Sequence, residues 1–218
     1  MLWTNHIASH FIPESNEWGI LHRLLKRYDV TPVDLCNLCG GLPSSDTRFT
    51  EVSYNIVSTD SCEFQIVTNR YHVTRRIDFS HKIVDNHHME VFAKGNGIGT
   101  SLFINQVRTA AQLGFRKISL FAAGPEYGPE YDGYVFWGKF GFLMADINDR
   151  EDFLEWANYL NYPETDLGQL LLYGEEGAWR LVGFSWSGTF DLAPRSKSWQ
   201  QLHQYLQIKG LLWMMDQA

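Results

Sequence analysis

Apolar and polar residues alternate along the first half of the chain in a way that predicts β-strands. The strand-like runs cover residues 49–57, 62–68 and 71–79, which are rich in β-branched and aromatic side chains. Residues 59–61 have the composition of a turn and would join the first two runs as a hairpin. A further extended, partly apolar run ends at Phe92. We therefore expect antiparallel strands in this part of the chain.

Apolar residues at helical spacing predict helices on both sides of these strands. Residues 18–28 carry an apolar stripe, and Thr31-Pro32 begins a second, short helix. After the strands, Phe103, Val107 and Ala110 recur at helical spacing in a segment that ends at Gly114. Further elements are expected in the last third: a helix capped by Asn148-Asp149, a short helix over 166–173, a strand or hairpin within 179–190, and a helix from Ser196 to Gly210.

The connection between the strand that ends at Phe92 and the next helix is rich in glycine. It reads Lys94-Gly95-Asn96-Gly97-Ile98-Gly99-Thr100. A strand, a glycine turn and a helix in this order aim backbone N–H groups at a phosphate, which side chains would otherwise hold away. The spacing matches neither a dinucleotide fingerprint nor a P-loop. A tight turn without a ligand is the alternative interpretation.

The glycine turn and the segment 118–142 together resemble a known family. The turn resembles the Arg/Gln-Gly-x-Gly-x-Gly/Ala turn of the GCN5-related N-acetyltransferase superfamily. A buried strand over 118–123 and the segment 133–142, which ends in Gly141-Phe142, are similar to the family's next strand and second motif. The resemblance covers residues 84–145, roughly a quarter of the 218-residue chain.

This resemblance implies a fold and a reaction. The fold would be α/β (α+β): a mixed, mostly antiparallel, splayed sheet flanked by helices. We expect a single domain with a core at about 49–145 and a C-terminal extension at about 146–218. The reaction would be transfer of an acetyl or longer acyl group from coenzyme A to a primary amine of a small molecule, peptide or protein. A non-catalytic acyl-CoA-binding module, or an interaction protein on the same fold, is the alternative.

The resemblance also implies which residues bind the acyl-CoA donor. The backbone N–H groups of the glycine turn would hold the pyrophosphate, with Lys94 standing where the family most often has arginine or glutamine. The pantetheine arm would lie in a cleft lined by two splayed strands. The expected acyl-CoA-binding residues are Phe92, Lys94, Gly95, Asn96, Gly97, Ile98, Gly99, Thr100, Phe121 and Ala122.

The catalytic residues that the resemblance implies lie on the strand before the turn and in the second motif. Glu90 or His88 would accept the proton of the attacking amine. Trp137 stands at the family's usual tyrosine position, so Tyr134, one turn earlier, is the candidate for protonating the thiolate. If residues 87–92 form a strand, His88, Glu90 and Phe92 share one face. A slip of one residue would exchange the faces and the candidates with them.

Charge and hydropathy exclude several classes of partner. The chain carries a formal net charge of −7, which argues against a nucleic-acid partner and is compatible with a cationic acceptor. No run of 18 apolar residues predicts a membrane span, and the first residues lack the pattern of a secretory signal. We expect a cytoplasmic protein. The apolar segment 211–215 either docks on the body of the protein or forms a contact with a partner or in a homodimer.

Cysteines and histidines raise the question of a metal. Cys36 and Cys39 form a C-x-x-C pair without a second pair to complete four ligands, so we expect packing cysteines. The chain contains three cysteines, and an odd number suits a reducing compartment. A metal site from His81, Asp85, His87 and His88 is conceivable. Adjacent histidines point to opposite faces of a strand, so at most one of the last two could ligate, and we expect no metal.

Overall fold

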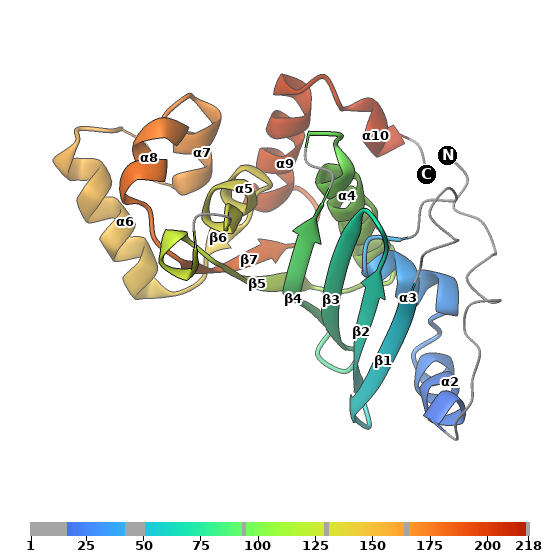
Figure 1. The fold of residues 1–218 in the computed structure, drawn as a ribbon. Coiled ribbons are helices and arrows are strands. Elements are labelled where there is room, and N and C mark those ends of the chain that lie inside the picture. The colour runs from blue at the N-terminus through green and yellow to red at the C-terminus, as the bar shows by residue number, and fades with distance from the viewer. Residues whose placement is uncertain (1–16, 42–50, 93–94, 129–130, 164–165, 217–218) are drawn as a thin grey trace. The chain divides into compact units, whose positions relative to one another are not determined.

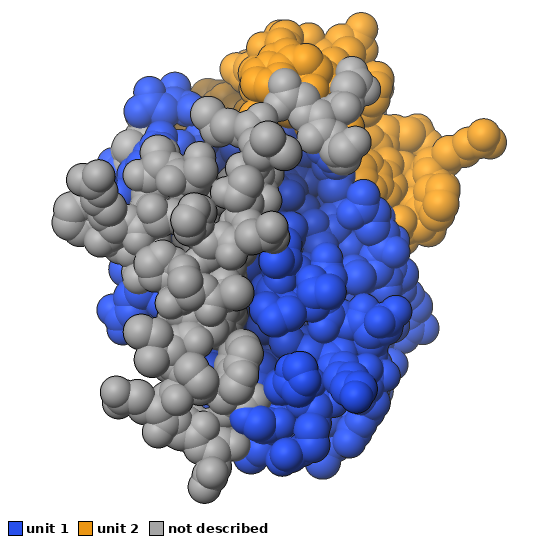
Figure 2. Space-filling view, turned by 90° about the vertical axis from the view of Figure 1, so that its right-hand side faces the viewer, with its two compact units in different colours: residues 1–116, 217–218 blue, residues 117–216 orange. Residues whose placement is uncertain are grey.

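A computed structural model of the chain describes residues 17–41, 51–92, 95–128, 131–163 and 166–216. The chain divides into two compact units, residues 1–116 with 217–218 and residues 117–216, which are coloured separately in Figure 2. The boundary falls inside the segment 49–145 that the sequence indicates as the core. A single domain with that core stays a prediction.

Unit 1 contains four sheet strands that pair in an antiparallel manner in the order β1-β2-β3-β4 (Figure 1). The strands closely match the predicted runs, although residues 49 and 50 lie outside the described ranges. A two-residue turn at Thr59 and Asp60 joins the first two strands, which confirms the predicted hairpin. The strand bounds are β1 (Glu51–Ser58), β2 (Ser61–Val67), β3 (Tyr71–Asp78) and β4 (Ile83–Val91).

Three helices complete the described part of unit 1: α2 (Glu17–Arg27), α3 (Pro32–Leu38) and α4 (Ile98–Gln112). Helix α3 begins with a capping box, in which Thr31 and Asp34 each accept a hydrogen bond from the other's backbone N–H. Helices α3 and α4 pack together beside the sheet (Figure 1). Between them and the strands lies a core that includes Leu35, Phe64, Ile66, Val73, Ile77, Val84, Phe103 and Val107.

A buried polar pair ties α4 to β4 and α3. The side-chain amides of Asn86 and Gln106 donate to each other's carbonyl oxygens at 3.1 and 2.8 Å, and Gln106 also donates to the Leu38 oxygen at 2.8 Å. Buried amides that are left unpaired cost about 1–3 kcal/mol, so this mutual satisfaction fixes one helix orientation. The pair therefore sets where the first turn of α4 lies relative to β4.

The three cysteines of unit 1 lie in its core, which confirms that they are packing residues. Cys36, Cys39 and Cys62 are free thiols with no exposed surface. Burial raises the pKa of Cys36 and of Cys62 to about 12, and burial is also the main cause that raises the pKa of Cys39. The thiolate is the reactive form, so these groups should be inert in the folded protein.

We expect a thiol-reactive disulfide reagent to modify none of the three cysteines in the native protein and all three in denaturant. The physical reason is that reaction needs both access and a thiolate, and the fold withholds both. Absorbance of the released reagent measures the number of modified thiols. Rapid modification of one thiol under native conditions would show that the α3 region opens readily.

Unit 2 contains three strands that pair in an antiparallel manner, in the order β5-β7-β6. Its strands are β5 (Lys117–Ala122), β6 (Leu143–Met144) and β7 (Trp186–Asp191). The described helices are the 3-10 turn η2 (Pro125–Tyr127), α5 (Gly133–Lys139), α6 (Ile147–Tyr159), α7 (Leu167–Leu172), α8 (Glu176–Val182), α9 (Lys197–Ile208) and α10 (Trp213–Asp216). Trp179 and Trp186 are both fully buried. Their indole N–H groups donate to the backbone oxygen of Tyr134 at 3.2 and 3.0 Å.

Two predictions for unit 2 were wrong in detail. The N-cap of α6 is Asp146, whose carboxylate accepts the Asn148 N–H, rather than Asn148-Asp149. Residues 179–182 are helical, because Trp179 anchors α8 in an aromatic core and Gly183 ends that helix, so the strand begins only at Trp186. Ser196 is confirmed as the N-cap of α9. Segment 211–215 ends in α10 with Trp213 half exposed, and a homodimer contact stays a prediction.

The described residues thus confirm a mixed α/β protein whose strands pair in an antiparallel manner within each unit. The splay expected between the strands before and after α4 concerns both units and stays a prediction, as does the acetyltransferase type of the fold. No helix among the described ranges is long and apolar enough to cross a lipid bilayer.

Candidate functional site

A β-bulge in β4 decides where the candidate catalytic residues point. From the turn after β3, the register pairs Asp78 with Ile83 and continues regularly to Arg75 opposite Asn86. The next pair is Thr74 opposite His88, so one extra residue, His87, is inserted in β4. Bulges turn side chains to the other face and are frequent beside functional sites. The bulge divides β4 into a lower half, residues 83–86, and an upper half, residues 88–91. Side chains in the two halves alternate between the faces of the sheet in opposite order.

The upper half of β4 carries His88 and Glu90 on the face away from α4. Below the bulge, Val84 and Asn86 are buried; above it, Met89 and Val91 lie against α4, next to Gly99. His88 and Glu90 therefore turn to the open face, where their side chains are 40% and 57% exposed. The predicted sharing of one face by these two residues is confirmed.

His72 on β3 joins them, and the sequence reasoning missed it. It lies directly opposite Glu90 in the register, and its ring centroid is 4.5 Å from that of His88. The His88 Nε2 atom is 3.7 Å from the Glu90 Oε2 atom. One ligand-type atom from each of the three side chains lies within 4.8 Å of the others. Two imidazoles and a carboxylate thus converge on the open face.

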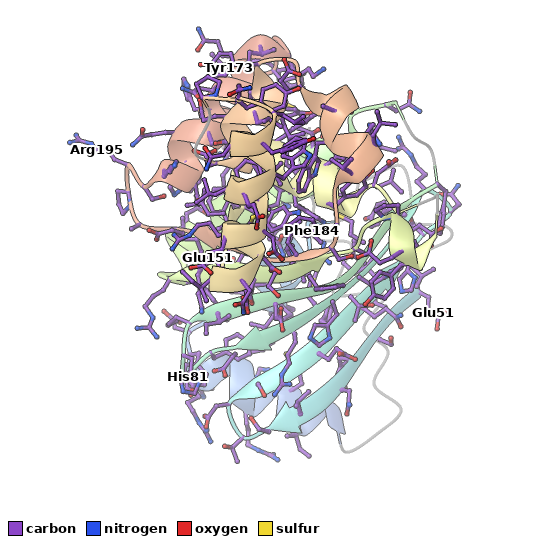
Figure 3. All side chains as sticks on the ribbon, turned by 90° about the vertical axis from the view of Figure 1, so that its left-hand side faces the viewer. Glu51, His81, Glu151, Tyr173, Phe184 and Arg195 are labelled. Carbon is purple, nitrogen blue, oxygen red and sulfur yellow. The ribbon has the colours of Figure 1, made fainter. Side chains whose placement is uncertain are left out.

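A chain of hydrogen bonds extends this cluster across the sheet. The Gln65 side-chain amide lies 2.6 Å from the His72 Nε2 atom, and the Ser53 hydroxyl donates to the Gln65 amide oxygen at 3.0 Å. Burial, and next the neighbouring imidazole of His88, lowers the pKa of His72 below its usual value. His72 is therefore a neutral, oriented imidazole at neutral pH. Figure 3 looks onto this open face of β1–β4, with α2 and α3 behind the strands.

The expectation that His87 and His88 point to opposite faces was wrong. The His87 Nδ1 atom lies 3.0 Å from a Glu63 carboxylate oxygen, and its Nε2 atom lies 3.2 Å from Asp85. Both carboxylates stand on the open face, so His87 lies on that face too, and the bulge turns His88 to the same face. His81 lies in the turn after β3, labelled in Figure 3, and contacts Asp78. The four residues first considered for a metal do not converge.

A buried arginine supports the bulge from the opposite face. Arg75 is 2% exposed, and its guanidinium donates to the backbone oxygen of Thr74 at 3.0 Å and to the backbone oxygen of His88. Burial lowers the pKa of Arg75 to about 10, so it remains charged at neutral pH. Its Nε atom is buried without a hydrogen-bond partner among the described residues. The guanidinium thus holds the backbone that carries His88.

The glycine turn has the open geometry that anion binding requires. Gly95, Asn96 and Gly97 are exposed, and Gly95 and Gly97 have φ of 86° and 69°, which favour glycine. A Cβ atom at either glycine would have no atom within 4 Å. Gly97 is the N-cap of α4 and supplies no side-chain cap. The N–H groups of residues 95–100 donate no backbone hydrogen bond to any described residue.

The remaining residues of the turn pack rather than project. Ile98 and Thr100 are buried, so the side chain of Thr100, one of the predicted acyl-CoA-binding residues, packs against the protein and does not project from the turn. A Cβ atom on Gly99 would lie 3.3 Å from the Met89 methyl carbon, so this glycine lets α4 approach β4 closely. Phe92 is 51% exposed. Lys94 lies outside the described residues.

In unit 2, the candidate residues fall in three different environments. Phe121 is 51% exposed and makes an edge contact with Tyr127, whereas Ala122 is fully buried. Tyr134 is 4% exposed, and its hydroxyl donates to the Arg180 oxygen at 3.3 Å. That bond uses the proton that a general acid would transfer. The environment of Tyr134 therefore favours its alternative role in packing.

Comparisons with known proteins do not assign the chain to a family. No family model matches it, and no curated protein and no solved structure shows a significant match.

Proposed function

We propose that this protein is an acyl-CoA-dependent N-acyltransferase that acts on a primary amine of a small molecule, peptide or protein. The observation that carries the proposal is the open glycine turn, whose N–H groups, unpaired within the described ranges, begin the 15-residue helix α4. Such N–H groups and the positive end of a helix dipole attract a pyrophosphate. The resemblance of residues 84–145 to the GCN5-related superfamily names coenzyme A as the molecule that supplies it.

The proposed base lies on the strand that leads into this turn. In the reaction, the amine nitrogen attacks the thioester carbonyl carbon, the C–N bond forms and the C–S bond breaks. A group on the protein must accept a proton from the amine. Glu90 and His88 are half exposed, adjacent and on one face of β4, which suits this role. The departing thiolate takes its proton from water, since the Tyr134 hydroxyl donates its hydrogen bond to the backbone oxygen of Arg180.

Two measurements test the proposal on the purified chain. Coenzyme A and acetyl-CoA should raise the melting temperature by several degrees, because a ligand at 100 times its Kd stabilises a protein by about 2.7 kcal/mol. Thiol release from acetyl-CoA should then depend on an added amine. The absence of any melting shift with coenzyme A or longer acyl-CoA would contradict the proposal.

Variants assign the proton acceptor and test the role of Tyr134. Replacing the true base, by Glu90→Gln or His88→Gln, should lower turnover by about 10²–10⁴-fold and leave the melting shift with coenzyme A unchanged. Tyr134→Phe should leave turnover nearly unchanged. A large loss of turnover in Tyr134→Phe would instead identify it as the acid.

A second candidate function is a non-catalytic acyl-CoA-binding module. One observation that favours it is the hydrogen bond from the Tyr134 hydroxyl. Another is Trp137, whose ring centroid lies 5.9 Å from that of Phe140 and 5.3 Å from that of Phe142. A melting shift with coenzyme A, without amine-dependent thiol release over a broad panel of amines and acyl donors, would support this function over the first.

A further inference from the structure

We infer that His72, His88 and Glu90 form a binding site for a divalent transition-metal ion, with Zn²⁺ as the expected occupant. The three side chains come from neighbouring positions of β3 and β4 and face the same side of the sheet. Imidazole nitrogen and carboxylate oxygen are ligands that Zn²⁺ prefers in proteins. This departs from the expectation of no metal, which rested on a different set of residues.

The distances fit an ion after small side-chain movements. Bonds of about 2.0–2.2 Å in tetrahedral geometry place neighbouring ligand atoms roughly 3.4 Å apart. His88 Nε2 and Glu90 Oε2 are already 3.7 Å apart. The full set lies within 4.8 Å, so closure needs movements on the order of 1 Å. His88 and Glu90 are half exposed, and their side chains can make this adjustment without repacking the core.

Hydrogen bonds from the neighbouring side chains of Gln65 and Ser53 orient one of the ligands, His72. The Gln65 amide nitrogen lies 2.6 Å from the His72 Nε2 atom. If this amide turns over, its oxygen accepts the Nε2–H proton and Nδ1 is left with the lone pair that a metal needs. The Ser53 hydroxyl, which donates to the Gln65 amide oxygen at 3.0 Å, can accept from the amide nitrogen after that rotation. Metal-binding histidines generally hold their second nitrogen in such a bond, which sets the tautomer and the ring orientation. The strands themselves supply a rigid base for the site.

The donor set also indicates the kind of ion. Two imidazoles with one carboxylate suit Zn²⁺ and other first-row transition metals, whereas Mg²⁺ and Ca²⁺ prefer oxygen ligands alone. Three protein ligands on an open face leave a coordination position for water, as in sites that are not purely structural. Nearby His87 is held by Glu63 and Asp85 instead, so it stands apart from this set.

The inference does not depend on the acyl-transfer proposal. If both proposals hold, Zn²⁺ binds to the side chains that would accept the proton of the amine. It should therefore inhibit acyl transfer without preventing coenzyme A binding. Metal binding is measured without coenzyme A, and coenzyme A binding without metal. Failure of one proposal is therefore distinguishable from failure of the other.

The test is calorimetric titration of Zn²⁺ into the full chain, stripped of metal with a chelator that is then removed. We expect one ion per chain with micromolar or tighter affinity. His72→Gln and His88→Gln should each weaken binding by at least about 100-fold, and Gln65→Leu by about 10–100-fold, as loss of a residue that orients a metal ligand does. His81→Gln and His87→Gln are matched controls and should bind as the unaltered chain does.

Circular dichroism establishes that each variant is folded. If His72→Gln does not fold, Glu90→Gln carries the test, because its side chain is 57% exposed. Absence of stoichiometric Zn²⁺ binding by the unaltered chain would overturn the inference. Equal weakening by His87→Gln and His72→Gln would also overturn it, since that result indicates nonspecific binding to surface histidines.

Discussion

Replacing Gly97 by glutamate is expected to abolish coenzyme A binding and, with it, acyl transfer. A glutamate there would place a side chain and a negative charge over the N–H groups proposed to hold the pyrophosphate. Losing two hydrogen bonds to a charged group costs at least about 3 kcal/mol, or more than 100-fold in affinity. The melting shift with coenzyme A measures the loss.

Gly114→Glu is the matched control for this change. Gly114 has φ of 70°, close to the 69° of Gly97, and a Cβ atom at either position would meet nothing within 4 Å. Both variants therefore carry the left-handed strain of about 1–2 kcal/mol. The new charge lies near the C-terminal end of α4 in the control, which costs a further few tenths to 1 kcal/mol. Coenzyme A binding that survives in Gly97→Glu would refute the proposed cradle.

Replacing Gly141 by alanine is expected to destabilise the protein by about 2–5 kcal/mol. Gly141 has φ of 94°, and its Cβ atom would lie 2.3 Å from the Ser198 backbone oxygen. That oxygen cannot move away easily, because Ser198 is fully buried and its hydroxyl accepts the Asp191 N–H at 3.0 Å. Thermal unfolding should show a melting temperature lower by roughly 5–20 °C.

Gly174→Ala separates the backbone strain from the steric clash. Gly174 has φ of 112°, but a Cβ atom there would meet nothing within 4 Å. This control should cost about 1–2 kcal/mol, from strain alone. Equal destabilisation by Gly141→Ala and Gly174→Ala would show that the approach of Ser198 is not what requires glycine at position 141.

Local patterns in the sequence determined most elements of this protein. The hairpin around Asp60, the helix that starts at Pro32 and the helix capped by Ser196 result from turn and capping chemistry that acts within a few residues. The glycine turn was also recognisable, because glycine adopts left-handed backbone angles at the least cost. Helix α8 was missed, because the burial of Trp179 among distant aromatic rings stabilises it.

The sequence by itself thus determined the strands, most helices and the turn, whereas the tertiary structure alone decided the composition of the cluster on the open face. A regular register from the β3–β4 turn would pair His72 with Met89 and turn His88 and Glu90 toward the core. The extra residue His87 reverses the alternation and brings both beside His72. No local preference marks that residue as a bulge. The contacts of the Arg75 guanidinium with the His88 backbone oxygen and of Met89 with the region of Gly99 accompany the bulge, and both join different elements of the fold.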